Sequence, residues 1–181
     1  MIERLREKKG YTLVEVLTVV SIMGILSAMG VVGLTGAIEN SKQKDGAMNV
    51  TEFLASVAAQ SVRMSEMVCV KKDGASGLVA YACPNGAKGD AGDVVDRIKF
   101  DDIFTVGCPE GVTSSLDGDD WLKGDGVAVF KPKTGLAAYP AEGFVCLTYK
   151  GGNGYSAAVK TESNNKLVWM KRSSNQDWAH R

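Results

Sequence analysis

The longest apolar segment of the chain runs from Val16 to Ile38 and contains no charged side chain over 23 positions. A helix rises about 1.5 Å per residue, so this segment would be about 34 Å long, which matches the hydrocarbon core of a bilayer. We therefore predict one membrane-spanning helix, within a segment that covers residues 11–38.

Basic side chains precede the apolar segment. Residues 1–10 contain four basic and two acidic side chains, a net charge of +2. The positive-inside rule places this end in the cytoplasm and the chain beyond Ile38 outside the inner membrane. A conventional cleaved signal peptide is the alternative, but its apolar core spans only about 7 to 15 residues and ends at an Ala-x-Ala-like site, which this segment lacks.

Apolar residues recur at steps of three and four through residues 39–67, which is typical of one face of an amphipathic helix. We expect the membrane helix to continue outward, to loosen around Gly46 and to pack this face on a globular head. Met64 and Met67 are expected to be core residues rather than metal ligands. The face consists of Ala47, Val50, Leu54, Val57, Met64 and Val68, and it is interrupted by Ser61.

From residue 68 onward the pattern changes to short β-rich runs separated by Gly, Asp, Asn and Pro, which indicates antiparallel sheet. The last two runs, Tyr155 to Lys160 and Lys166 to Arg172, predict a closing hairpin. The fold class follows as α+β, with a long N-terminal helix packed on an all-β head at residues 68–181. The predicted strand runs are 68–72, 77–83, 96–102, 126–132, 143–149, 154–160 and 166–172.

Glu15 is the acidic residue directly before the apolar run. A carboxylate carried into hydrocarbon costs about 2.5 to 3.5 kcal/mol, so it usually has a partner. Cleavage after Gly10 would provide one, because Tyr11 would gain a positive α-amino group one helical turn before Glu15. The first turn of a helix also favours a negative charge. The alternative is that Glu15 only marks the solvated edge of the span.

These features together resemble the class III leader of type IV pilins and type II secretion pseudopilins. The shared features are a short basic leader ending in Gly10, an aromatic residue, the sequence TLVEV and a long apolar helix. The resemblance implies that a prepilin peptidase removes leader residues 1–10 by cutting after Gly10 and methylates Tyr11. It also implies that Glu15 helps the subunit join a filament by neutralising the N-terminal amine of a neighbour.

Two features depart from the common pattern of this family. Tyr11 stands where Phe is commoner, and the apolar run contains no Pro where many members have one. Any bend of the helix is then left to its glycines. These are Gly24, Gly30, Gly33 and Gly36.

The order of elements in the head is similar to the GspH/FimT branch of minor pilins and pseudopilins, whose heads are two β-sheets packed beside the helix. The shared order is a helix, a strand pair, an IKF strand, a turn-rich loop, a Gly-led apolar strand and a last hairpin. That branch often has a Gly-Arg turn in the closing hairpin, whereas this chain has NNKLVW at residues 164–169.

The two resemblances imply a structural subunit, a minor pilin or pseudopilin, of a type IV pilus or type II secretion filament. Its expected partners are the prepilin peptidase, other pilins and the inner membrane. An alternative function for this chain is that of a major pilin. An isolated membrane-anchored domain without a filament is the opposing interpretation. Small side chains that would let helices approach closely are Ser27, Ala28, Gly30 and Gly33.

Four cysteines lie in the predicted head: Cys69, Cys83, Cys108 and Cys146. An even number in an oxidising compartment indicates disulfides, and four cysteines allow three pairings. We favour Cys69 with Cys83 and Cys108 with Cys146, and buried free thiols are the alternative. A zinc site would need closely spaced cysteines or several histidines, and the only histidine is His180.

Charge and motif composition narrow the function further. Removing residues 1–10 takes away four of 21 basic and two of 21 acidic side chains, leaving 17 and 19 among 171 residues. The acidic segment DGDDWLKGDG, residues 117–126, suggests calcium, but it lacks the spacing and terminal Glu of a twelve-residue calcium loop. We interpret it as a solvated loop. With no catalytic or phosphate-binding motif, we expect no enzyme activity, small-molecule substrate or cofactor.

A basic patch near the C-terminus provides a second functional hypothesis. Residues 160–181 hold five basic and two acidic side chains, with Trp169 and Trp178 among them. Such a patch can bind phosphates and stack bases, so a DNA-binding minor pilin of a DNA-uptake pilus is the alternative function. A solvated sheet edge is the other interpretation. The candidate DNA contacts are Lys160, Lys166, Lys171, Arg172 and Arg181.

Overall fold

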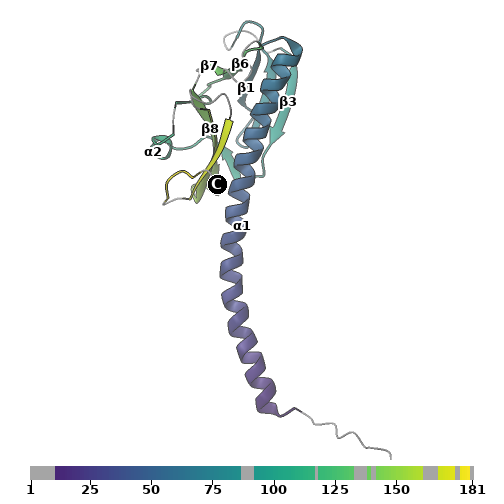
Figure 1. The fold of residues 1–181 in the computed structure, drawn as a ribbon, viewed down its shortest axis with the longest axis vertical. Helices are drawn as coiled ribbons and strands as arrows, with labels where there is room; N and C mark the ends of the chain where they lie inside the picture. The colour runs from purple at the N-terminus through teal and green to yellow at the C-terminus, as the bar shows by residue number, and fades with distance from the viewer. Residues whose placement is uncertain are drawn as a thin grey trace, which may run out of the picture. The chain divides into compact units, whose positions relative to one another are not determined.

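The computed structural model describes residues 11–86, 92–116, 118–132, 138–139, 142–160, 167–173 and 176–179. A long N-terminal helix is followed by mainly antiparallel β-sheets (Figure 1), which confirms the predicted α+β, pilin-like fold class. The chain divides into two compact units, residues 1–40 and residues 41–181. Helix α1 contributes to both units, and each unit is described by itself.

Helix α1 extends from Leu13 to Met64. Thr12 precedes it, and its Oγ1 accepts a hydrogen bond from the backbone N–H of Glu15 at 3.2 Å, as a residue that caps a helix start does. The helix ends where Ser65 takes a positive φ of 58°. A left-handed residue breaks the helical hydrogen-bond pattern. Met67, which the sequence pattern had placed in the helix, therefore lies in the turn before the first strand.

Within the described residues, the strands form two sheets of five strands each. In the first sheet the order is β3-β2-β1-β6-β7, and in the second it is β10-β9-β8-β4, with β5 parallel to β8. The first sheet contains β1 (Val68–Lys72), β2 (Gly77–Ala82), β3 (Val94–Lys99), β6 (Ala128–Phe130) and β7 (Ala138–Tyr139). The second contains β4 (Phe104–Val106), β5 (Asp119–Asp120), β8 (Gly143–Tyr149), β9 (Gly154–Lys160) and β10 (Leu167–Ser173), and helix α2 (Glu110–Thr113) lies between β4 and β5.

Three predicted runs, residues 68–72, 143–149 and 154–160, coincide with β1, β8 and β9. The closing hairpin of β9 and β10 is also confirmed, with Trp169 opposite Ala158, while its connection at residues 161–166 lies outside the described residues. The run predicted at residues 96–102 begins and ends too late, because the chain leaves the sheet at Phe100. Strands β4, β5 and β7 were not predicted, since two or three residues show no periodicity.

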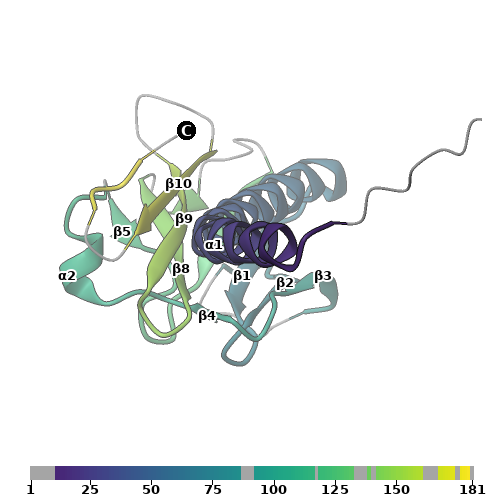
Figure 2. The same ribbon diagram turned by 90° about the horizontal axis from the view of Figure 1, so that it is seen from below.

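The main hydrophobic core of the head lies between the second half of α1 and the two sheets. Val50, Leu54 and Val57 of α1 have no exposed surface and share one cluster with Phe130 and Leu147 from the two sheets. Figure 2 shows the two sheets as separate groups of strands, with β1, β2 and β3 in one group and β8, β9 and β10 in the other. The apolar face that the sequence predicts for residues 39–67 is therefore the face that packs on the head.

Two details of that face differ from the prediction. Met64 is 42% exposed and is not a core residue, because α1 ends there and the chain turns away. Ser61, which interrupts the apolar series, is instead fully buried. Its Oγ lies 2.8 Å from the Glu66 carbonyl oxygen and 3.0 Å from the Phe130 carbonyl oxygen. A buried hydroxyl is tolerated when it has such acceptors.

Gly46 does not loosen α1, contrary to the expectation from sequence. The helix is unbroken there, and a Cβ at Gly46 would lie 2.8 Å from ring atoms of Phe104. The Ser156 hydroxyl donates to the Gln43 carbonyl oxygen at 2.6 Å, one turn earlier in α1. The missing side chain of Gly46 thus allows the helix to approach the second sheet closely.

Candidate functional site

The first part of α1 presents an apolar surface. None of the described side chains from Tyr11 to Met29 is buried, and Leu13 and Ile38 are 80% and 47% exposed. Among the described residues, α1 is the helix that is long and apolar enough to cross a membrane, by length and composition alone. This surface is available to lipid or to other helices.

Glu15 occupies the first turn of α1. Its backbone N–H is held by Thr12, and its carbonyl oxygen accepts a hydrogen bond from Thr18 Oγ1 at 2.9 Å. The side chain is exposed, so its carboxylate sits beside the positive end of the helix dipole and can meet a cation from outside the chain. Tyr11 lies just before the helix, and Gly10 falls outside the described residues.

The structure contains two disulfides, with the pairing that we favoured from the sequence. Cys69 in β1 is bonded to Cys83 after β2, and Cys108 before α2 is bonded to Cys146 in β8. No cysteine remains free. The first disulfide joins neighbouring strands, and the second attaches the segment that carries α2 to the outer face of the second sheet.

Replacing Cys69 and Cys83 together by Ala is expected to lower the free energy of unfolding by about 3 kcal/mol. The two cysteines are 14 residues apart, and a loop of that length loses about this much denatured-state entropy when it is closed. Urea unfolding followed by circular dichroism measures the change, and changing both residues leaves no thiol to pair wrongly. An unchanged unfolding midpoint would contradict a stabilising role for this bond.

The acidic segment at residues 117–126 is more than the solvated loop that composition suggested. Trp121 and Leu122 are 3% and 1% exposed and belong to the main core, while Asp119 and Asp120 form β5. Among the described residues, no group of three or more His, Cys, Asp or Glu side chains is placed to hold a metal ion. The hydrophobic pattern did not identify Trp121 and Leu122 as core residues, because charged residues flank them on both sides.

Asp120 is the partly buried member of this segment. Burial raises the pKa of its carboxyl above the ordinary value of 3.8, although a hydrogen bond from the Leu122 N–H to Oδ1 at 3.0 Å and the charges of Lys72 and Lys123 act in the opposite direction. An acid whose pKa is raised on folding binds more protons in the folded chain. Its contribution to stability therefore falls as the pH rises from 3.8 through the folded pKa.

Asp120→Asn is accordingly expected to raise the melting temperature at pH 7 and to leave it unchanged well below pH 3.8. The amide keeps an acceptor for the Leu122 N–H and removes the half-buried charge. Thermal unfolding at pH 7 and at low pH tests this. Asp119→Asn, which removes the same charge at the exposed neighbouring position, is the matched control for the loss of one negative charge.

The basic residues near the C-terminus that the structure describes, Lys160, Lys171 and Arg172, do not share one solvated surface. Lys160 is only 5% exposed. Arg172 Nη1 and Trp178 Nε1 both donate to the Val112 carbonyl oxygen, at 2.8 and 3.0 Å, which fastens α2 to β10 and to the chain beyond it. Lys166 and Arg181 lie outside the described residues.

Trp169 and Lys171 lie on the other face of β10 from Arg172, since side chains alternate along a strand. The Trp169 ring is approached by Lys44 of α1, whose Nζ lies 5.7 Å from the ring centroid. Trp169 and Trp178 therefore each contact other parts of the head. The described residues of the predicted patch therefore do not share one face of β10, and DNA binding by this patch stays a prediction.

Residues 5–31 match a family model described as the prokaryotic N-terminal methylation motif. The matched range includes Gly10, Tyr11 and Glu15 and ends within the apolar part of α1. No curated protein and no solved structure matches the chain significantly. The likeness of the head to the GspH/FimT branch stays a prediction. The motif and the fold together identify a chain with a type IV pilin-like leader on a pilin-like α+β architecture.

Proposed function

We propose that this chain is a minor pilin or pseudopilin, a structural subunit of a type IV pilus or type II secretion filament. The observation that carries the proposal is the match of residues 5–31 to the N-terminal methylation motif, together with the exposure of the apolar side chains in the first part of α1. If the helices of several subunits pack together in a filament, the apolar surface of α1 would be covered and the processed N-terminus would provide the charge that pairs with Glu15.

In this proposal the peptide bond after Gly10 is hydrolysed by a prepilin peptidase and the new α-amino group of Tyr11 is methylated. The exposed Glu15 carboxylate pairs with the N-terminal amine of a neighbouring subunit as both enter the apolar filament core. Pairing offsets part of the energy of transferring the two charges from water, and either charge buried alone would be more unfavourable than the pair. The pilin-type motif supports a structural rather than an enzymatic role.

The proposed location is the bacterial inner membrane, with residues 1–10 in the cytoplasm and the head in the periplasm. After processing, the chain moves from the membrane into the filament. The four basic residues of the leader support this orientation by the positive-inside rule. Two disulfides in the head suit an oxidising compartment. The proposed partners are the peptidase and other pilins.

Quantitative mass spectrometry of sheared surface filaments and of membranes tests the proposal. We expect a peptide that begins at methylated Tyr11, in small amounts beside another pilin in the sheared fraction. A dominant sheared signal would make the chain a major pilin, and processed chain found only in membranes would make it a secretion pseudopilin. An intact Met1 terminus in every fraction would refute the proposed processing.

A further inference from the structure

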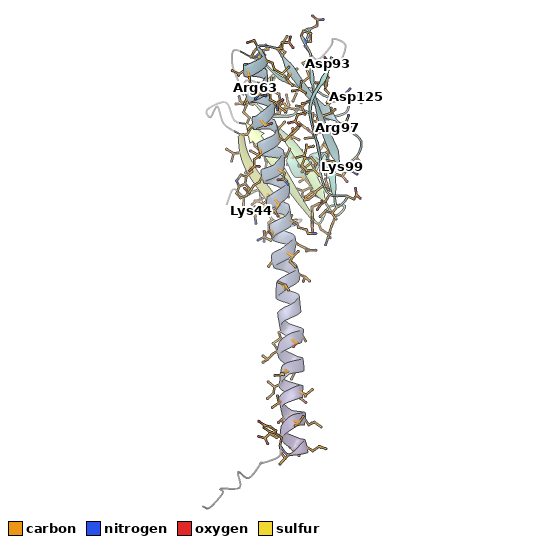
Figure 3. All side chains as sticks on the ribbon, turned by 90° about the vertical axis from the view of Figure 1, so that its right-hand side faces the viewer. Lys44, Arg63, Asp93, Arg97, Lys99 and Asp125 are labelled. Carbon is orange, nitrogen blue, oxygen red and sulfur yellow. A yellow bond between two sulfur atoms is a disulfide. The ribbon has the colours of Figure 1, made fainter. Side chains whose placement is uncertain are left out.

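Strand β3 (Val94–Lys99) is the outermost described strand of the first sheet, with β2 on one side only. Arg97 and Lys99 on this strand are exposed, and Figure 3 shows both at the side of the head. Beside β3 lies a groove of about 330 Å³ whose opposite wall is α1, lined by Glu52 and Ser56 among others. The outer edge of β3 is therefore accessible.

The strand register shows which backbone groups face that edge. Lys99 is opposite Gly77 and Arg97 is opposite Val79, and the Phe100 N–H donates to the Ser76 carbonyl oxygen at 2.8 Å. In an antiparallel pair, this bond makes Lys99 and Arg97 members of non-hydrogen-bonded pairs. Their N–H and C=O groups therefore point away from β2, toward the open edge.

Asp96 covers one of these outward groups. Its Oδ1 accepts the hydrogen bond of the Arg97 N–H at 2.8 Å, where the carbonyl of a neighbouring strand would otherwise bind. Its Oδ2 lies 3.3 Å from Gln60 Nε2 and 3.4 Å from Ser56 Oγ, both on α1. Helix α1 thus holds the Asp96 carboxylate where it accepts the hydrogen bond of the outward-facing Arg97 N–H.

Open sheet edges invite pairing with another chain, and natural proteins usually block them. The edge of the second sheet is blocked differently, since Lys171 of β10 and Ala179 exchange two backbone hydrogen bonds, at 2.9 and 3.1 Å. On β3 the block consists of a side chain, because the Arg97 guanidinium is itself paired with a carboxylate of the same sheet region, with 3.0 Å between Arg97 Nε and Asp73 Oδ2.

We propose that Asp96 closes the β3 edge against antiparallel pairing with β3 of a second copy of this chain. The carboxylate takes the place of an incoming carbonyl at the Arg97 N–H, and α1 keeps it there through Ser56 and Gln60. The inference goes beyond the proposed filament and rests on the edge geometry alone. Copies of the chain concentrated in one membrane would then keep their heads separate.

The test compares the self-association of full-length variants in the same detergent micelles by sedimentation equilibrium. Asp96→Ala is expected to raise the association constant at least tenfold over the unaltered chain. Asp96→Asn keeps an oxygen acceptor for the Arg97 N–H and should behave as the unaltered chain. Asp93→Ala is the matched control, because it removes the same charge from an exposed position next to the same strand.

A double variant, Asp96→Ala with Arg97→Pro, separates edge pairing from other causes. Proline removes the outward N–H without breaking the ladder to β2, and edge strands tolerate such a proline. We expect it to restore the association constant of the unaltered chain. Asp96→Val, with a residue that favours strands, repeats the test if the Ala variant does not fold. Unchanged association of both Asp96→Ala and Asp96→Val, or raised association that the proline does not reverse, would overturn the proposal.

Discussion

Glu15→Val is expected to yield a chain that is still cleaved after Gly10 and held in the membrane, but is depleted about a hundredfold in filaments. Removing the carboxylate leaves a neighbour's N-terminal amine without a partner in an apolar environment, at about 2.5 to 3.5 kcal/mol. A difference of 1.4 kcal/mol is a factor of ten in an equilibrium, which gives the expected depletion. Quantitative mass spectrometry of the sheared and membrane fractions measures it.

The amount of Glu15→Val chain in the membrane fraction distinguishes loss of charge pairing from a failure of the chain to insert into the membrane. Val is more favourable than Glu in hydrocarbon, so insertion should be at least as efficient as in the unaltered chain. Gly10→Ala is the processing control and should remain uncut with an intact leader. Normal incorporation of the Glu15→Val chain would show that charge pairing does not drive assembly, and Glu15 would then only mark the edge of the span.

Gly118→Ala is expected to lower the free energy of unfolding of the head by about 4 kcal/mol. Gly118 has a φ of +79°, a left-handed conformation that costs other residues about 1 to 2 kcal/mol. A Cβ there would also lie 2.5 Å from the Gly143 backbone nitrogen and 2.6 Å from the Glu142 carbonyl carbon. Backbone atoms cannot rotate away, so overpacking adds about 1 to 3 kcal/mol. Urea unfolding measures the loss.

Gly124→Ala is the matched control for this prediction. Gly124 also has a left-handed φ, of +63°, but a Cβ there would meet no atom within 4 Å. Its substitution should therefore cost only about 1 to 2 kcal/mol, from the conformation alone. Equal destabilisation by the two substitutions would mean that the backbone at Gly118 and Gly143 makes room for a Cβ without further cost.

Elements with a sustained periodicity were predictable from local sequence. Val50, Leu54 and Val57 recur at helical spacing and are among the buried residues of α1, and the apolar runs of β8 and β9 agree with the structure. Trp121 and Leu122 were missed because a short apolar pair between acidic residues resembles a loop. Gly46 was misinterpreted because glycine lowers helix stability, and the sequence does not show that the Phe104 ring packs against this position.

The sequence by itself determined the N-terminal part of this protein: the N-terminal methylation motif, the position of Glu15 and the apolar helix. These depend on the order and spacing of neighbouring residues, which a linear pattern records. Only the tertiary structure decided the features of the head. In these features Arg172 and Trp178 donate hydrogen bonds to the Val112 carbonyl oxygen, and Asp96 closes the β3 edge. Those contacts join residues far apart in the chain, and long-range packing sets their geometry.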